Sequence, residues 1–246
     1  MIRATLRNII KDLNIYFGDN SDKSVTDDMI INISKDGLCI SFGIDNGRQI
    51  VINELHKCGF TGTELLERIE LLAQDKNIST ILLDDQSSVN FGDYKFDLAT
   101  LSIITKGRSW YNSLGYYSNN HSIEQQEWEI IRESKLDDLF NYILTIDYEK
   151  YISKNKGWYH DGLLFFCSSN EITLNEDNYN EVLTKALEYL SVEFDLDETV
   201  KSFGIRLSII SKNNTSEEYE VIKYLLMLSV ISYAIEYTRY PLIKNV

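Results

Sequence analysis

The stretch from Met29 to Leu55 reads MIINISKDGLCISFGIDNGRQIVINEL, and it decides the expected fold. Its apolar residues fall into three short runs, Met29–Ile33, Leu38–Phe42 and Gln49–Leu55, separated by Asp-Gly and Asn-Gly turns. These dipeptides favour the positive φ angles of tight hairpin turns, whose twist matches that of the flanking strands. The stretch therefore predicts an antiparallel meander of three strands.

Helical periodicity appears on both sides of this meander. Apolar residues spaced by three and four predict amphipathic helices over residues 2–13 and 63–74. A short apolar run at 78–83 predicts a strand, and residues 97–106 predict a further helix that ends at Gly107. The order of helix, strands, helix, strand and helix indicates an α/β (α+β) fold, a mixed sheet with flanking helices, over residues 1–120.

The chain changes character after about residue 120 and becomes mainly helical. The apolar run Leu163–Phe166 is interpreted as a short buried strand within this region. Two domains are therefore predicted, 1–120 and 121–246, with the alternative that both share one core. The expected helices of the second region are 123–132, 136–146, 179–192, 198–211 and 216–237.

Composition and charge limit the partners of the protein. The 246 residues are 43% apolar and 25% charged, as in ordinary globular proteins, with a net charge of −14. Such a surface repels nucleic acid and anionic lipid, since both are bound through clustered Lys and Arg. The uncharged run within Val221–Ile235 is about twelve residues, whereas a membrane span needs about twenty. It is therefore predicted to be a buried core helix, and neither nucleic acid nor membrane is expected as a partner.

Cysteine and histidine spacing indicates neither a metal site nor secretion. Cys39, Cys58 and Cys167 are odd in number and far apart, without a CxxC pair, and the three histidines show no metal-ligand spacing. The N-terminus lacks the apolar core of a signal peptide. We therefore expect a reducing, cytoplasmic environment and no metal. A single proline and abundant Asn, Ile, Lys and Tyr are typical of an AT-rich genome, such as that of a large DNA virus or an intracellular parasite.

Two glycine-marked segments stand out as candidates for chemistry. The first, Gly59-Phe60-Thr61-Gly62-Thr63, opens the helix predicted at 63–74. The second, Trp110-Tyr111-Asn112-Ser113-Leu114-Gly115-Tyr116, sets two aromatic residues before a Gly-aromatic pair. Glycine lets a backbone approach a ligand closely, and the free N–H groups at a helix N-terminus attract anions.

Over about residues 28–118 this order of elements and motifs resembles the GNAT N-acetyltransferase superfamily. The resemblance implies that acetyl-coenzyme A or another acyl-coenzyme A binds with its pyrophosphate at Gly59, Gly62 and Thr63. It implies that Tyr111 protonates the departing thiolate and that Glu54, near the end of the third strand, is the general base toward an amine. The acceptor is then a small molecule or a basic protein.

Each candidate residue also has a purely structural interpretation. The family pattern Q/R-x-x-G-x-G/A is shifted by one at Gly59, and the acidic Glu64 and Glu67 disfavour a nearby pyrophosphate. Trp110 and Tyr111 also suit packing around a tight turn, and Glu54 also suits the solvent side of a strand. The alternative function is thus a non-catalytic structural or protein-interaction protein, including a homodimer formed through Val221–Ile235. The two functions differ at residues 59–63, where a cofactor site requires open N–H groups.

Overall fold

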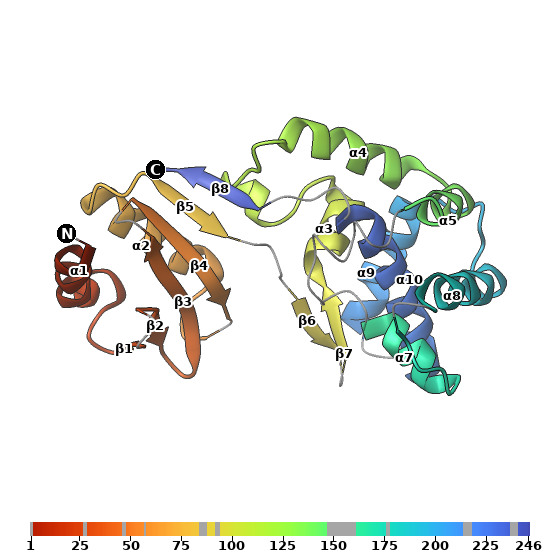
Figure 1. Ribbon diagram of the computed structural model, residues 1–246, viewed down its shortest axis with the longest axis horizontal. Helices are drawn as coiled ribbons and strands as arrows, with labels where there is room; N and C mark the ends of the chain where they lie inside the picture. Colours follow the sequence, from red (N-terminus) through yellow and green to blue (C-terminus); the bar gives the residue numbers. More distant parts are fainter. Residues whose placement is uncertain are drawn as a thin grey trace. The chain divides into compact units, whose positions relative to one another are not determined.

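The structure, a computed structural model, consists of two compact units. The sheet unit comprises residues 1–85, 115–119 and 240–246, and the helical unit comprises 86–114 and 120–239 (Figure 1). The chain thus passes between the units at 85/86, 114/115, 119/120 and 239/240. The single boundary predicted near 120 coincides with the third of these passages. The mixed α/β class is confirmed. The residues described are 2–26, 29–45, 48–56, 58–83, 88–91, 94–146, 161–175, 178–213, 218–236 and 241–246.

The sheet unit is built on one six-stranded mixed sheet in the order β1-β2-β3-β4-β5-β8. Neighbouring strands run antiparallel except for β4 and β5, which are parallel and are joined through α2. The predicted meander is confirmed as β2, β3 and β4. The strands are β1 Asp22–Val25, β2 Ile31–Ser34, β3 Leu38–Asp45, β4 Gln49–Leu55, β5 Thr80–Leu83 and β8 Leu242–Asn245.

The turn between β2 and β3 follows the predicted chemistry. Asp36 and Gly37 both have positive φ, 58° and 118°, as a tight hairpin turn with this twist requires. The second predicted turn includes Asn46 and Gly47, which lie outside the described residues. Strand β1, which the sequence analysis did not predict, adds a polar edge to β2.

Two helices, α1 (Ile2–Phe17) and α2 (Gly62–Asp75), pack against each other in the sheet unit. Both confirm predicted helices. The Tyr16 hydroxyl of α1 donates a hydrogen bond to Asp75 of α2 over 3.0 Å, and Arg68 donates to the Tyr16 carbonyl. Buried apolar residues alternate along β2 and β4, which is typical of a sheet with one covered face.

Tyr16 gives this helix pair a specific pH dependence. Burial, with the hydrogen bond to Asp75 as second cause, raises the pKa of Tyr16 from 10.0 to about 12. Because the unfolded chain loses this proton first, the stabilisation is complete below pH 10 and is lost as pH rises toward 12. Urea unfolding between pH 9 and 12 is therefore expected to show that Tyr16→Phe loses less stability than wild type as the pH rises. An equal loss in both proteins would contradict this assignment.

The C-terminal strand β8 is fixed to the sheet unit by a buried polar cluster. Lys244 of β8 pairs with Glu70 of α2 over 2.8 Å, and the fully buried Tyr116 donates to the same carboxylate over 3.0 Å. Tyr117 forms an isolated bridge with Ile243. The sequence predicts that a last strand begins at Tyr116–Ser118; the structure has only this bridge there, and β8 takes the place beside β5.

The helical unit packs around α10, whose side chains from Tyr224 to Ile235 are mostly buried in one apolar core. The predicted core helix is confirmed, because these residues face that core. Among the described residues no helix is long and apolar enough to cross a membrane. The helices are α3 Leu98–Lys106, α4 His121–Glu133, α5 Leu136–Ile143, α7 Asp161–Ser169, α8 Tyr179–Glu193, α9 Val200–Asn213 and α10 Glu218–Glu236.

Two local predictions fail in the helical unit. Leu163–Phe166 lies in helix α7 and not in a strand, because a run of four apolar residues suits either structure and the packing against α10 selects the helix. Strands β6 (Ser88–Phe91) and β7 (Tyr94–Asp97) form a hairpin that was not predicted, although apolar residues alternate with polar ones along both strands in the sequence. The end of α3 is as predicted, since Gly107 closes it with φ of 75°.

Candidate functional site

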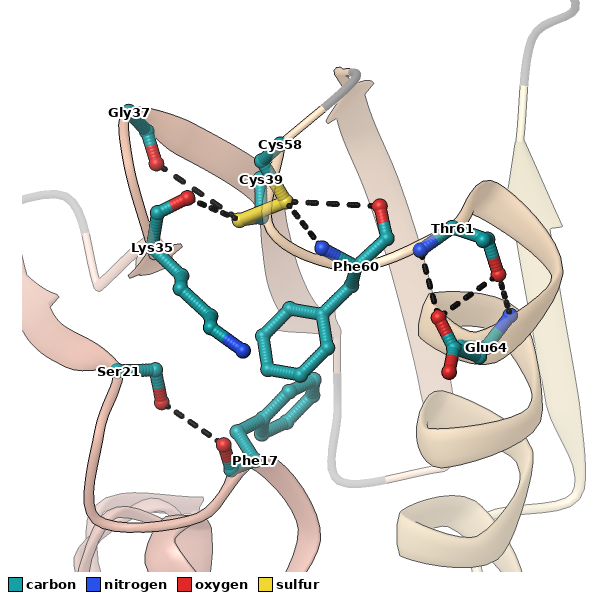
Figure 2. The surroundings of a disulfide bond; sticks show 9 residues. All are labelled: Phe17, Ser21, Lys35, Gly37, Cys39, Cys58, Phe60, Thr61 and Glu64. Carbon is teal, nitrogen blue, oxygen red and sulfur yellow. Dashed lines mark hydrogen bonds between the residues drawn. A yellow bond between two sulfur atoms is a disulfide. The ribbon is translucent and has the colours of Figure 1, made fainter.

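The turn that leads from β4 into α2 is held by a disulfide bond. Cys39, at the start of β3, is joined to Cys58 in the turn, with their Cα atoms 5.3 Å apart (Figure 2). The two cysteines are nineteen residues apart in the sequence. They come close together because the β3–β4 hairpin brings the end of β4 back beside the start of β3. The wide cysteine spacing was therefore misleading for this pair. Cys167 is a free, buried thiol whose pKa is raised by burial.

The first residues of the turn use their N–H groups internally. The Gly59 N–H donates to the Lys35 carbonyl over 3.1 Å, and the Phe60 N–H donates to the Cys58 sulfur over 3.3 Å. A β-carbon on Gly59 would lie 2.7 Å from the Lys35 side chain. The glycine itself is exposed, but its N–H is bonded within the protein and is not free for a phosphate.

Phe60 lies at the centre of this arrangement. Its half-buried ring carries the Lys35 ammonium 4.5 Å from the ring centroid and the Arg68 guanidinium 4.8 Å from it. Cation–π contacts of this kind contribute about 0.5–1 kcal/mol each at exposed sites. The two cations hold the ring beside the turn, as Figure 2 shows for Lys35.

A capping box occupies the N-terminus of α2. The Thr61 N–H donates to the Glu64 carboxylate over 2.7 Å, and the Glu64 N–H donates to the Thr61 hydroxyl over 3.2 Å. The hydrogen bond from the Thr61 backbone is the main cause that lowers the pKa of Glu64, so this carboxylate is ionised at neutral pH. For the N–H groups of Gly62 and Thr63 no acceptor lies within the described part of the chain.

The capping box predicts a local effect on stability. Thr61→Ala is expected to cost about 1 kcal/mol, because the Glu64 N–H loses its acceptor at the helix start. Since the folded pKa of Glu64 lies below 4.5, its contribution is present above that pH and is lost on further acidification. Chemical unfolding at pH 7 and pH 3 measures this loss. Wild type should lose the contribution of Glu64 to the free energy of unfolding between these pH values, and Glu64→Gln should not. A parallel loss in both proteins would exclude the proposed role of Glu64.

The candidate base Glu54 lies at the exposed end of β4. A bulge precedes it: Ser41 pairs with Glu54 but Phe42 with Ile52, so Asn53 is an extra residue in β4. The Glu54 carboxylate lies 2.8 Å from Nε2 of His56, and both side chains are about half exposed (55% and 51%). The sequence analysis did not select His56, although Glu and His two residues apart on a strand lie on one face.

Tyr111, the candidate acid, belongs to the helical unit, whereas Glu54, Gly59, Gly62 and Thr63 belong to the sheet unit. It begins a 3-10 turn over Tyr111–Leu114, is 7% exposed, and packs edge-on against Trp110 at 4.8 Å. Ser109 and Asn112 brace this turn through reciprocal backbone and side-chain hydrogen bonds. No single unit therefore contains the whole predicted site, and the burial of Tyr111 is typical of packing.

A second candidate site is an acidic hollow in the helical unit. It lies between the start of α5 and the segment that follows α8, and four exposed aspartates give it a negative charge. One of them, Asp197, pairs with Lys135 over 2.6 Å, which lowers its pKa. Among the described residues no group of His, Cys, Asp or Glu could hold a metal ion. The lining is Lys135, Asp137, Asp138, Ser191, Phe194, Asp195, Leu196 and Asp197.

Comparisons of the chain with protein-family models, with curated proteins and with solved structures find no match. The GNAT resemblance therefore rests on the sequence motifs alone. The candidate sites are judged below on their own geometry.

Proposed function

We propose that this chain is a non-catalytic protein-interaction protein. The observation that carries the proposal is the use of the turn's N–H groups. Those of Gly59, Phe60 and Thr61 are bonded within the protein, and Glu64 sets an ionised carboxylate at the helix start. A carboxylate at this position repels the pyrophosphate that an acyl-coenzyme A would bring.

The acidic hollow of the helical unit is the surface that suits a partner. Lys135 offsets one of its four aspartate charges, which leaves Asp137, Asp138 and Asp195 to attract cations. Phe194 and Leu196 add apolar lining. The chemistry fits a basic protein segment, in which Lys or Arg meets the carboxylates while the side-chain stems lie on the apolar lining. The proposal excludes nucleic acid and membrane as partners. The Cys39–Cys58 bond does not suit the reducing cytoplasm that the cysteine spacing led us to expect, because such a compartment keeps thiols reduced.

A lysine-rich decapeptide at low ionic strength tests this partner class by fluorescence anisotropy. The double variant Asp137→Asn/Asp195→Asn is expected to bind roughly two- to thirtyfold more weakly, because each of the two exposed ion pairs contributes about 0.2–1 kcal/mol. The matched control, Asp19→Asn/Asp36→Asn, removes the same charge from exposed positions of the sheet unit. Equal weakening in both double variants would show that only net charge matters, and the hollow would lose its role.

Acyl-coenzyme A-dependent N-acyl transfer is the second candidate, and a specific feature favours it. The parallel β4–β5 ladder ends at the pair Ile52 and Leu83, and β4 then continues with Glu54 at its exposed end. The N–H groups of Gly62 and Thr63 remain for a phosphate among the described contacts.

In this candidate Glu54 or the neighbouring His56 takes the proton from the amine. Release of free thiol from acetyl-coenzyme A in the presence of spermidine or the lysine-rich peptide tests it. Transfer that falls at least a hundredfold in Glu54→Gln would favour this candidate over the first. If neither acceptor gives thiol release, acyl transfer is excluded for these acceptors and the non-catalytic protein-interaction function is favoured.

A further inference from the structure

We propose that Cys39 and Cys58 form a reversible redox staple, which a dithiol reductant opens at Cys58 to release the turn before α2. This inference is independent of either proposed function. It concerns a covalent bond whose position decides how firmly residues 56–61 are held.

The two sulfurs differ in accessibility. Cys39 is fully buried beneath the sheet edge, whereas Cys58 is partly exposed in the turn. A thiolate from solvent therefore reaches the Cys58 sulfur and not that of Cys39. Attack on Cys58 breaks the Cys39–Cys58 bond and forms a mixed disulfide between Cys58 and the reductant.

The electrons and protons of the reaction then balance without a further reactant. Cys39 leaves as a thiolate and takes up a proton. The second thiol of the reductant attacks its own sulfur in the mixed disulfide, so that Cys58 leaves as a thiolate and is protonated in turn. The protein gains two electrons and two protons as two thiols, and the dithiol is oxidised to a cyclic disulfide.

The reduced form finds hydrogen-bond acceptors already in place. The Cys39 sulfur lies 3.6 Å from the Lys35 carbonyl and 3.7 Å from that of Gly37, and the Cys58 sulfur lies 3.9 Å from the Phe60 carbonyl. A thiol is a weak donor, and each of the two new thiols has an acceptor within reach (Figure 2). Reduction therefore needs no rearrangement of β3 to satisfy the buried sulfur.

The rest of the hairpin does not depend on the staple, but the turn does. The β3–β4 ladder runs from Ile40↔Leu55 to Asp45↔Gln49 and closes the hairpin without the disulfide. Beyond Leu55, backbone hydrogen bonds from His56 and Gly59 hold the turn to the sheet. Loss of the covalent link therefore lowers the free energy of local unfolding at Gly59, Phe60 and the Thr61 cap, and the hydrogen bonds between β3 and β4 remain formed.

Native-state hydrogen exchange of the full chain, oxidised and then reduced with dithiothreitol, tests the inference. The amides of Gly59, Phe60, Thr61 and Glu64 are expected to exchange at least tenfold faster after reduction. The amides that pair β3 with β4 should stay far better protected than those of the turn in both redox states, and they should accelerate only by the factor that the lost global stability gives. Re-oxidation with oxidised glutathione should restore the slow exchange. Maleimide labelling followed by mass spectrometry should modify Cys58 before Cys39.

Two variants complete the experiment. Cys58→Ser should show fast exchange at the turn in either redox condition, and Cys167→Ser, which removes only the buried free thiol, should keep the full response. The inference is overturned if dithiothreitol reduces the bond only in denaturant. Loss of protection throughout the β3–β4 ladder, down to the level of the turn, would also overturn it, since the bond would then hold the whole hairpin together.

Discussion

Loss of the Cys39–Cys58 bond is expected to produce one of the two largest changes in stability. A cross-link that closes a loop of this length, nineteen residues apart in sequence, is expected to contribute about 3 kcal/mol by restricting the unfolded chain. Under oxidising conditions Cys58→Ser should therefore unfold about 3 kcal/mol more easily than wild type. Urea unfolding followed by far-ultraviolet circular dichroism measures this difference.

The control for this prediction is the redox condition itself. With dithiothreitol present, both proteins lack the bond, so their free energies of unfolding should agree to within about 1 kcal/mol, the scale of an ordinary surface or partly buried substitution. A difference that persists undiminished in the reductant would mean that the serine, and not the missing bond, destabilises the variant. Equal stability under oxidising conditions would contradict the predicted contribution.

Gly162→Ala is expected to destabilise the helical unit by roughly 1–3 kcal/mol, the usual cost of adding an atom to a packed interior. At Gly162 helix α7 crosses α10 so closely that a β-carbon would lie 2.4 Å from the Ser229 hydroxyl oxygen and 2.8 Å from the Leu225 carbonyl. The carbonyl belongs to the backbone of a buried helix and cannot rotate away. The two helices must therefore separate along their contact.

Gly204→Ala is the matched control for this crossing. A β-carbon there would meet the Ile104 side chain at 2.7 Å, and a side chain can shift more readily than a backbone. Alanine also gains up to about 1 kcal/mol over glycine in a helix, so the net change at Gly204 should be the smaller. Guanidinium unfolding, monitored by the fluorescence of Trp110 and Trp128 in the helical unit, compares the two variants.

A double variant identifies the cause. Ser229→Ala removes the hydroxyl that a β-carbon at Gly162 would meet, but it leaves the Leu225 carbonyl in place. In the Gly162→Ala background it should therefore recover only part of the lost stability, with a positive coupling in a double-mutant cycle. Gly162→Ala with wild-type stability would show that the crossing is wider than described.

Much of the sheet was predictable from local signals, and the parts that were missed depend on remote partners. The strands of the meander are short apolar runs joined by Asp-Gly and Asn-Gly, so pattern and turn chemistry agree. By contrast, β1 reads Asp-Lys-Ser-Val and has no apolar alternation of its own. Strand β8 is four residues long, and its pairing with β5 spans most of the chain.

The candidate site was predictable only in part. Thr61 and Glu64 have the T-x-x-E spacing of a capping box, and the sequence thus indicates where α2 starts. The contacts that close the turn come from Lys35 and Cys39, which precede it by about twenty residues, and from Arg68 in the second turn of α2. Such contacts depend on how the hairpin and helix pack. The assignment of Tyr111 to the helical unit likewise depends on tertiary structure, which motif spacing does not encode.

Thermal unfolding of the purified protein with and without millimolar acetyl-coenzyme A tests the central claim most directly. A ligand that binds only the folded state at a hundredfold excess over Kd adds about 2.7 kcal/mol of stability, which raises the midpoint by several degrees. Because the N–H groups of Gly59, Phe60 and Thr61 are bonded within the turn and the Glu64 carboxylate lies at the helix start, we predict no change in the midpoint. A rise of several degrees that is absent in Gly62→Glu would contradict the account, since the turn would then be a working cofactor site.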